Sequence, residues 1–231
     1  MSTYLVINLL IVIVPLLFSF EKKIRFHTKI TSYLFSVAIV SPVFIIWDMI
    51  ATSRGDWAFN PEHISSLIIY NLPIDEILFF FTVPYSCLFI YETVSFYILQ
   101  KELSINPVIL KVVALVLVLS ALIFIDRYYT ATVLLFTAAF LVISVFFFSQ
   151  IIKLKLYWIT IAITFIPFLI FNFVLTYIPV VIYSDEAIWG IKLITIPVED
   201  FFYSYSMISF WILIYLLREN KIKLRLLFSK R

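Results

Sequence analysis

The sequence predicts an all-α polytopic membrane protein with seven transmembrane helices, arranged as two parallel three-helix repeats joined by a connector helix. Three observations lead to this fold class. The chain of 231 residues is 64% hydrophobic and only 13% charged, which leaves too few charges to cover a soluble surface. Seven stretches approach the roughly 20 apolar residues that span a bilayer. The same short motif also occurs in both halves of the chain.

The predicted membrane segments cover residues 4–20, 30–50, 73–99, 108–125, 130–149, 156–177 and 197–217. The first segment lacks a basic n-region and a small-residue cleavage site, so we expect an anchor that is not removed as a signal peptide. Basic residues gather in the loops of one side, because only Arg54, Arg127 and Lys192 of the 17 fall in loops of the other side. This bias predicts an N-terminus outside and a C-terminus in the cytoplasm. The expected location is a bacterial-type inner membrane. We expect the basic tail at 218–231 to lie on anionic headgroups.

Several kinds of site are excluded by residue counts. Cys87 is the single cysteine, and His27 and His63 are the only histidines, so no Cys/His metal-ligand spacing exists. Gly55 and Gly190 are the only glycines, which excludes the glycine-rich loops that hold dinucleotides and ATP. We therefore expect neither a metal nor a cofactor, and no nucleic-acid partner, because the net positive charge follows from membrane topology.

An internal repeat relates the two halves at a spacing of 124 residues. Pro73 and Pro197 lie this far apart, and the same offset pairs Asp75 with Glu199 and Glu76 with Asp200. Further pairs are Trp47 with Phe171, Asp48 with Asn172, Thr52 with Thr176 and, with one extra residue, Pro42 with Pro167. A single connector helix returns the chain to the same side of the membrane, so the two halves are parallel repeats. The site of such repeats is expected at their interface. The predicted division is 1–103, the connector 104–127, and 128–231.

Two acidic motifs open long apolar runs, LPIDEILFFF at residues 72–81 and IPVEDFFYSY at 196–205. Proline followed by acids in the first turn is also ordinary helix-start chemistry, and that interpretation stays open for either pair alone. Two repeated pairs favour function, because charges near a bilayer are costly and usually face a functional interior. Several carboxyl groups in one apolar site do not all ionise, so a neutral proton donor is expected beside an ionised acceptor.

Candidate residues follow from this geometry, because the starts of the third and seventh segments and the end of the second share one depth. The catalytic candidates are Glu76, Glu199, Asp75, Asp200 and Asp48, and the substrate-binding candidates are Trp47, Asn172, Phe79, Phe80, Tyr85, Phe202 and Tyr203. Aromatic faces stabilise a cation, although most of these rings are expected to serve packing. We expect Trp57 and Trp189 in the aromatic belt at the membrane interface. Glu92 lies about 24 Å beyond Glu76 along a helix and is expected at the opposite surface.

At these residues the chain resembles the small membrane lycopene cyclases, which occur as two-subunit bacterial enzymes, as fused chains and as the cyclase part of a fungal bifunctional protein. The resemblance rests on Pro73-Ile74-Asp75-Glu76, Pro197-Val198-Glu199-Asp200 and the stretches FIIWDMIATSRGDWAFNP and VPYSCLFIYE. It covers nearly the whole chain and suggests a fused form, with Asp75 standing where the family is expected to have Glu. It implies cofactor-free closure of the ψ ends of lycopene into β-ionone rings through a carbocation.

The resemblance also implies the partners, namely a linear carotene delivered through the lipid phase and the membrane lipids themselves. Self-association and association with other carotenoid enzymes stay open, as do the number of ends cyclised and the ring type. Among other classes, a retinal photoreceptor needs a lysine in the last helix, and a prenyltransferase needs Asp-rich metal motifs, and the sequence has neither. A proton-coupled transporter is the remaining alternative, since intramembrane carboxylates and parallel repeats suit it.

The charge bias generates a topology prediction. A tag at the C-terminus is expected to be reached by a membrane-impermeant probe only after cells are opened, whereas a tag at the N-terminus is expected to react in intact spheroplasts. A C-terminal tag that reacts from outside would contradict a seven-helix arrangement with this orientation.

Overall fold

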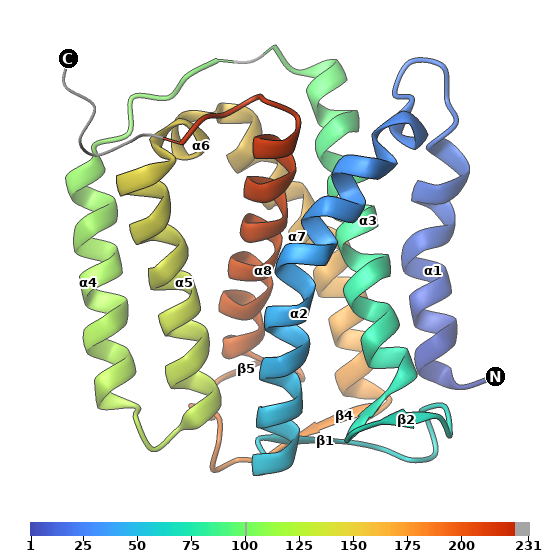
Figure 1. Ribbon diagram of the computed structural model, residues 1–231. Helices are drawn as coiled ribbons and strands as arrows, with labels where there is room; N and C mark the ends of the chain where they lie inside the picture. The colour runs from blue at the N-terminus through green and yellow to red at the C-terminus, as the bar shows by residue number, and fades with distance from the viewer. Residues whose placement is uncertain (100, 225–231) are drawn as a thin grey trace.

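The computed structural model describes residues 1–99 and 101–224 and consists mainly of long helices packed side by side (Figure 1). These are α1 (Thr3–Phe18), α2 (Ile30–Arg54), α3 (Ile74–Tyr97), α4 (Pro107–Ile123), α5 (Tyr128–Phe147), α7 (Lys155–Tyr177) and α8 (Val198–Arg218). Two short elements, the 3-10 helix η1 (Phe26–Lys29) and α6 (Ser149–Lys153), precede α2 and α7. The predicted all-α class is confirmed, and each predicted segment overlaps one long helix. Arg225, Lys230 and Arg231 of the predicted basic tail lie outside the described residues.

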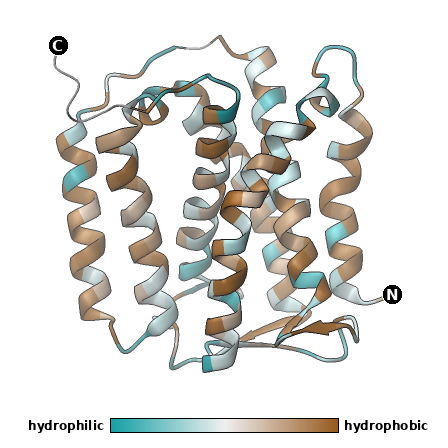
Figure 2. Cartoon of the chain, viewed as in Figure 1, coloured by the Kyte–Doolittle hydropathy of each residue, from teal (hydrophilic) through white to brown (hydrophobic). Residues whose placement is uncertain are grey.

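Five helices are long and apolar enough to cross a membrane, namely α2, α3, α5, α7 and α8. The remaining two, α1 and α4, are apolar but have only 16 and 17 residues, about 24–26 Å of helix. Figure 2, coloured by residue hydropathy, shows that apolar residues predominate along the length of the helices. The protein is therefore an integral membrane protein, while a count of seven crossings and their orientation stay predictions.

Local sequence explains where the helices begin and end. The Ser2 hydroxyl accepts a hydrogen bond from Leu5 N–H at the start of α1, and the Asn106 side chain accepts one from Val108 N–H at the start of α4, as N-cap residues do. Gly55 ends α2 with φ 82°, a left-handed conformation that glycine adopts without steric cost. The following chain is thereby turned back across the end of the bundle.

Six short strands, which the sequence analysis did not predict, cover the end of the bundle where α3 and α8 begin (Figure 1). They are β1 (Trp57–Phe59), β2 (Ile68–Ile69), β3 (Leu72–Pro73), β4 (Val181–Tyr183), β5 (Lys192–Leu193) and β6 (Ile196–Pro197). Antiparallel pairs form between β1 and β4, β2 and β3, and β5 and β6. Strands of two or three residues give too weak a periodicity to be recognised in a sequence.

The strand pairs recur at the spacing of 124 residues. Ile68 pairs with Pro73, and Lys192 pairs with Pro197 in the same register. The turns between these strands place Tyr70 and Ile194 at φ 66° and 60°, again 124 residues apart. Both halves therefore lead into their acidic motif through the same hairpin.

The β1–β4 pair joins the two halves symmetrically. Its central pair is Ala58 with Ile182, two residues that are themselves 124 positions apart. Beside it, Asn60 N–H donates to Val180 C=O (3.0 Å) and Ser184 N–H donates to Asp56 C=O (2.9 Å). The two hydrogen bonds correspond under the repeat, because Ser184 lies 124 residues after Asn60 and Asp56 lies 124 residues before Val180. The backbone thus has two-fold symmetry where the loops meet.

The contacts between helices also correspond in the two halves. The first half places α1 on α3 and the second places α5 on α8, while α2 packs against α8 and α3 against α7 across the halves. The connector helix α4 packs on α5 at the edge of the bundle (Figure 1). The starts of α3 and α8 and the end of α2 consequently face one another, which brings the acidic motifs together.

The turn at Ile194 generates a stability prediction. Its φ of 60° is unfavourable for a β-branched side chain, and left-handed backbone costs such residues about 1–2 kcal/mol. Ile194→Gly is therefore expected to raise the free energy of unfolding by about 1 kcal/mol, measured as thermal stability in detergent. The control Leu193→Gly, at a neighbouring position with ordinary φ, is expected to lower it. Equal effects of the two substitutions would contradict the assigned turn.

Candidate functional site

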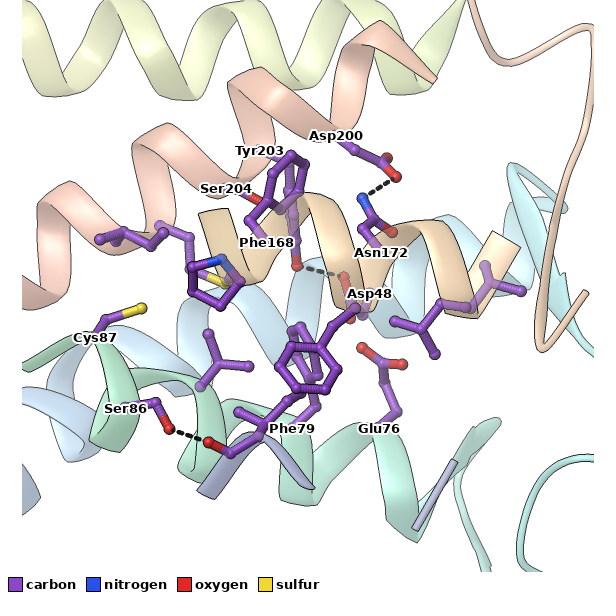
Figure 3. Close-up of a pocket in the computed structure, with 18 of the residues that line it drawn as sticks. Asp48, Glu76, Phe79, Ser86, Cys87, Phe168, Asn172, Asp200, Tyr203 and Ser204 are labelled. Carbon is purple, nitrogen blue, oxygen red and sulfur yellow. Dashed lines mark hydrogen bonds between the residues drawn. The ribbon is translucent and has the colours of Figure 1, made fainter. Parts of the chain in front are cut away.

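A cavity lies between the two halves, enclosed by α3, α7 and α8 with contributions from α1, α2 and the strands. It contains about 970 Å³ of space not filled by atoms, its open mouth included. Carboxyl groups lie at the end of the cavity near the strands, and mostly apolar side chains line the rest (Figure 3). An apolar chamber with a few converging polar groups is the usual form of a small-molecule site.

Two carboxyl groups face each other at the end of the cavity. Asp48, near the end of α2, and Glu76, in the first turn of α3, are within hydrogen-bonding reach of each other (Figure 3). Tyr4 donates to Glu76 Oε2 (2.6 Å) and Tyr203 donates to Asp48 Oδ1 (2.9 Å). Both carboxyl groups are buried, at 2% and 7% exposure. Two carboxyl groups this close repel when both are ionised and share a proton favourably.

Asp200 forms a second polar centre in the first turn of α8. It accepts hydrogen bonds from Tyr129 (2.6 Å), Asn172 (2.8 Å) and Tyr183 (2.9 Å). Three donors suit an ionised carboxylate. Burial, followed by the charge of Asp200, raises the pKa of Tyr183 well above its usual range, so this hydroxyl remains a donor. The two centres therefore differ, one holding a carboxyl pair and the other a single, fully hydrogen-bonded carboxylate.

The first acid of each motif has a different environment. Asp75 accepts hydrogen bonds from Ser65 N–H, from Ser65 Oγ (2.9 Å) and from Ser2 Oγ (3.2 Å). At the corresponding position, Glu199 accepts from Trp189 N–H and from Thr130 Oγ1. Ser65 and Trp189 are themselves 124 residues apart. Asp75 and Glu199 thus attach the loops that precede α3 and α8 to the starts of those helices, as helix-start carboxylates.

Only part of the predicted site lines the cavity. Of the five acids, Glu76, Asp200 and Asp48 line it, whereas Asp75 and Glu199 do not. Buried Glu199 Oε2 makes no hydrogen bond within the described part of the chain. Of the seven predicted substrate-binding residues, Asn172, Phe79 and Tyr203 line the cavity, and Trp47, Phe80, Tyr85 and Phe202 do not.

The four residues outside the cavity have packing roles. Phe80 is fully buried in the helix core, and Tyr85 exchanges a hydrogen bond with Ser19 (2.6 Å). Trp47 packs on Trp57 and Arg54, and Phe202 packs against the contact between α4 and α5. Each of these four residues is adjacent in sequence to a residue that lines the cavity. Only the tertiary packing decides which face of each helix points toward the cavity.

Tyrosines are the main residues that sequence reasoning missed. Tyr4 and Tyr129 each donate to the second acid of one motif, and the backbone N–H of each bonds a loop carbonyl, His63 for Tyr4 and Ala187 for Tyr129. They lie 125 residues apart, so the repeat carried a signal for them. Tyr183, in β4, gave no such signal.

Trp57 also lines the cavity and is only 7% exposed. The expectation of a belt position was therefore wrong for Trp57, because the β1–β4 pair folds it inward. Trp189, in contrast, is 46% exposed.

Glu92 lies apart from the cavity, at the opposite end of α3. It is paired with Lys29 and Lys221 (2.8 Å for the latter) and accepts a hydrogen bond from Tyr215 (2.8 Å). These contacts join η1, α3 and the chain after α8. In the described residues no group of three His, Cys, Asp or Glu side chains is arranged to hold a metal ion.

A family model described as lycopene cyclase matches residues 1–94 and 126–217, which together make up most of the chain and leave out a stretch containing α4. No curated protein and no solved structure was found to match the chain.

The loop contacts generate a prediction about Asp75. Asp75→Ala removes the acceptor of Ser65 N–H and of two hydroxyls, and a buried donor left unsatisfied costs about 1–3 kcal/mol. We expect lower thermal stability in detergent and faster proteolysis within residues 60–70. Glu62→Ala, an exposed acid of the same loop, is the control. Equal stability of both variants would show that Asp75 does not hold the loop.

Proposed function

Because the chain belongs to the lycopene cyclase family, we propose that it converts the linear ψ ends of lycopene into β-ionone rings by acid–base catalysis. Family membership makes it a cyclase enzyme of carotenoid biosynthesis. The ring type and the steps of the reaction are proposals, supported chiefly by the placement of three carboxyl groups, Asp48, Glu76 and Asp200, at the end of an apolar cavity.

The proposed first step is proton transfer to the terminal double bond of the substrate. The Asp48–Glu76 pair is the proposed donor, because a carboxyl pair in contact holds a proton between its two members. Tyr4 and Tyr203 hydrogen-bond the pair from opposite sides and stabilise the negative charge that remains after donation. General acid help of this kind is typically worth about 10²–10⁴ in rate.

Protonation leaves a carbocation, which the neighbouring double bond attacks to close a six-membered ring. The new cation then loses a ring proton, and the electrons of that C–H bond form the ring double bond. Asp200 is the proposed acceptor, and its negative charge also stabilises the cation electrostatically. Return of the proton from Asp200 to the carboxyl pair restores the enzyme, so the reaction is an isomerisation without net redox change.

The cavity walls support a cationic intermediate in two further ways. Aromatic side chains surround the carboxyl end, among them Trp57, Phe79 and Phe171, and ring faces attract cations. An apolar wall also excludes water, which would otherwise trap the cation as an alcohol. Asp75 and Glu199 are proposed as positioning residues that hold the starts of α3 and α8.

The proposed setting is the lipid phase of an inner membrane, with the N-terminus outside and the carboxyl end of the cavity near the outer surface. Linear carotene and membrane lipids are the proposed partners. The recurrence of contacts at 124 residues supports two parallel repeats, 1–103 and 128–231, with 104–127 as connector. A proton-coupled transporter would use the same carboxyl groups but would leave the carotene unchanged.

Carboxamide substitutions test the assignment. Glu76→Gln, Asp48→Asn and Asp200→Asn are each expected to lower the rate of lycopene conversion by about 10²–10⁴, since an amide neither donates nor accepts the required proton. Glu199→Gln is expected to lose activity only as far as it loses stability. The measurement is the ratio of β-carotene to lycopene at matched protein abundance, with Glu62→Gln as control. Wild-type conversion by Glu76→Gln and Asp200→Asn would remove these residues from the mechanism.

Cofactor independence is a separate prediction. Purified protein in liposomes is expected to convert lycopene without added NAD(P)H, flavin, ATP or divalent metal, and addition of a chelator is expected to change the rate less than twofold. The products are measured by absorbance and chromatography. A strict requirement for reduced flavin would contradict simple acid–base chemistry.

A further inference from the structure

The cavity extends well beyond the carboxyl groups. On α3 its lining runs from Glu76 to Ile90, fourteen residues, or about 21 Å along the axis. Val83 and Cys87 continue this wall, and Figure 3 shows Cys87 displaced along α3 from Glu76. An elongated apolar channel of this length suits a straight hydrocarbon chain with one end at the acids.

Between α3 and α7 the lining of the cavity is only partly buried. Phe79, Val83 and Ile90 of α3 and Pro167 and Phe168 of α7 line it while remaining half-exposed. Partly exposed lining residues on two neighbouring helices point to a lateral opening between those helices. In a membrane protein the medium outside that opening is lipid.

Under the internal repeat, the space between α3 and α7 corresponds to the space between α8 and α2. Side chains fill the space between α2 and α8. Trp211 stands 124 residues after Cys87, is fully buried, and donates its indole N–H to Ser41 Oγ (3.2 Å). Phe44 stands 124 residues before Phe168, is 1% exposed, and packs on Tyr203. At one pair of corresponding positions the symmetric backbone thus carries a small residue beside the cavity, Cys87, and a large one in the filled cleft, Trp211.

We infer that the groove between α3 and α7, kept open by Cys87, is the lateral entrance through which a linear polyene passes from the lipid to the carboxyl groups. This inference rests on the proposed function for the identity of the substrate. It adds the path by which the polyene enters and the number of polyene ends bound at one time. One groove holds one end of the polyene. A substrate with two linear ends leaves and re-enters between the two ring closures, so a monocyclic product is released.

The test varies the side-chain size at Cys87. Cys87→Ala widens the groove slightly, and Cys87→Leu, Cys87→Phe and Cys87→Trp narrow it stepwise. Binding of lycopene to purified protein in detergent is measured by visible absorbance after gel filtration, in a Glu76→Gln background that prevents conversion. Conversion is measured separately in liposomes without that substitution. Val83→Trp narrows the same wall from a half-exposed position and provides a second variant in case Cys87→Trp does not fold. Ile170→Trp is the matched control, because Ile170 is a lipid-exposed residue of α7 outside the cavity lining.

The expected result is a loss of bound lycopene that grows with side-chain size, at least tenfold for Cys87→Trp and Val83→Trp, with Ile170→Trp unchanged. In the conversion assay, wild-type protein is expected to release monocyclic product before bicyclic product. Wild-type binding by the stable Cys87→Trp and Val83→Trp variants would overturn the entrance, as would a wild-type chain that binds no polyene. If the wild type binds lycopene and these variants do not, yet nothing is cyclised, the entrance stands and the proposed reaction fails.

Discussion

Carboxyl groups buried among apolar helices are stable only where hydrogen-bond donors replace the water they have lost. This constraint governs the end of the bundle where the two halves meet. Tyr4 and Tyr203 serve the Asp48–Glu76 pair, and Tyr129, Asn172 and Tyr183 serve Asp200. These donors come from α1, α5, α7, α8 and β4, so the site forms only when both halves are in place.

The donors in turn depend on the loops. Asp75 and Glu199 bind loop N–H groups at Ser65 and Trp189, and the β1–β4 pair ties the two loops together about Ala58 and Ile182. These few loop contacts position the starts of α3 and α8. The same pair carries Trp57 and Tyr183 inward, so the element that closes the end of the cavity also supplies part of its wall.

Symmetry of the backbone and asymmetry of the side chains have different consequences. Corresponding hydrogen bonds at Glu76 and Asp200 bring two acids to one depth, yet Asp48 corresponds to Asn172, so one side holds a carboxyl pair and the other a carboxylate with an amide donor. Cys87 and Trp211 differ in the same manner along the clefts. The internal repeat gives a frame with two equivalent positions, and single residue differences then distinguish the proposed donor from the proposed acceptor and the proposed entrance from the closed wall.

The sequence by itself determined the helical class, the apolar segments, the spacing of 124 residues and the importance of the acidic motifs, because composition and local pattern carry these features. It brought Glu76, Asp200, Asp48, Asn172, Phe79 and Tyr203 into the candidate site. Only the tertiary structure separated Glu76 from Asp75 and Asp200 from Glu199, since adjacent residues on a helix point about 100° apart and the neighbouring helices decide which faces the cavity. The tertiary structure also decided the positions of Trp57, Tyr183 and Cys87, because the residues around them belong to segments that are distant in the chain.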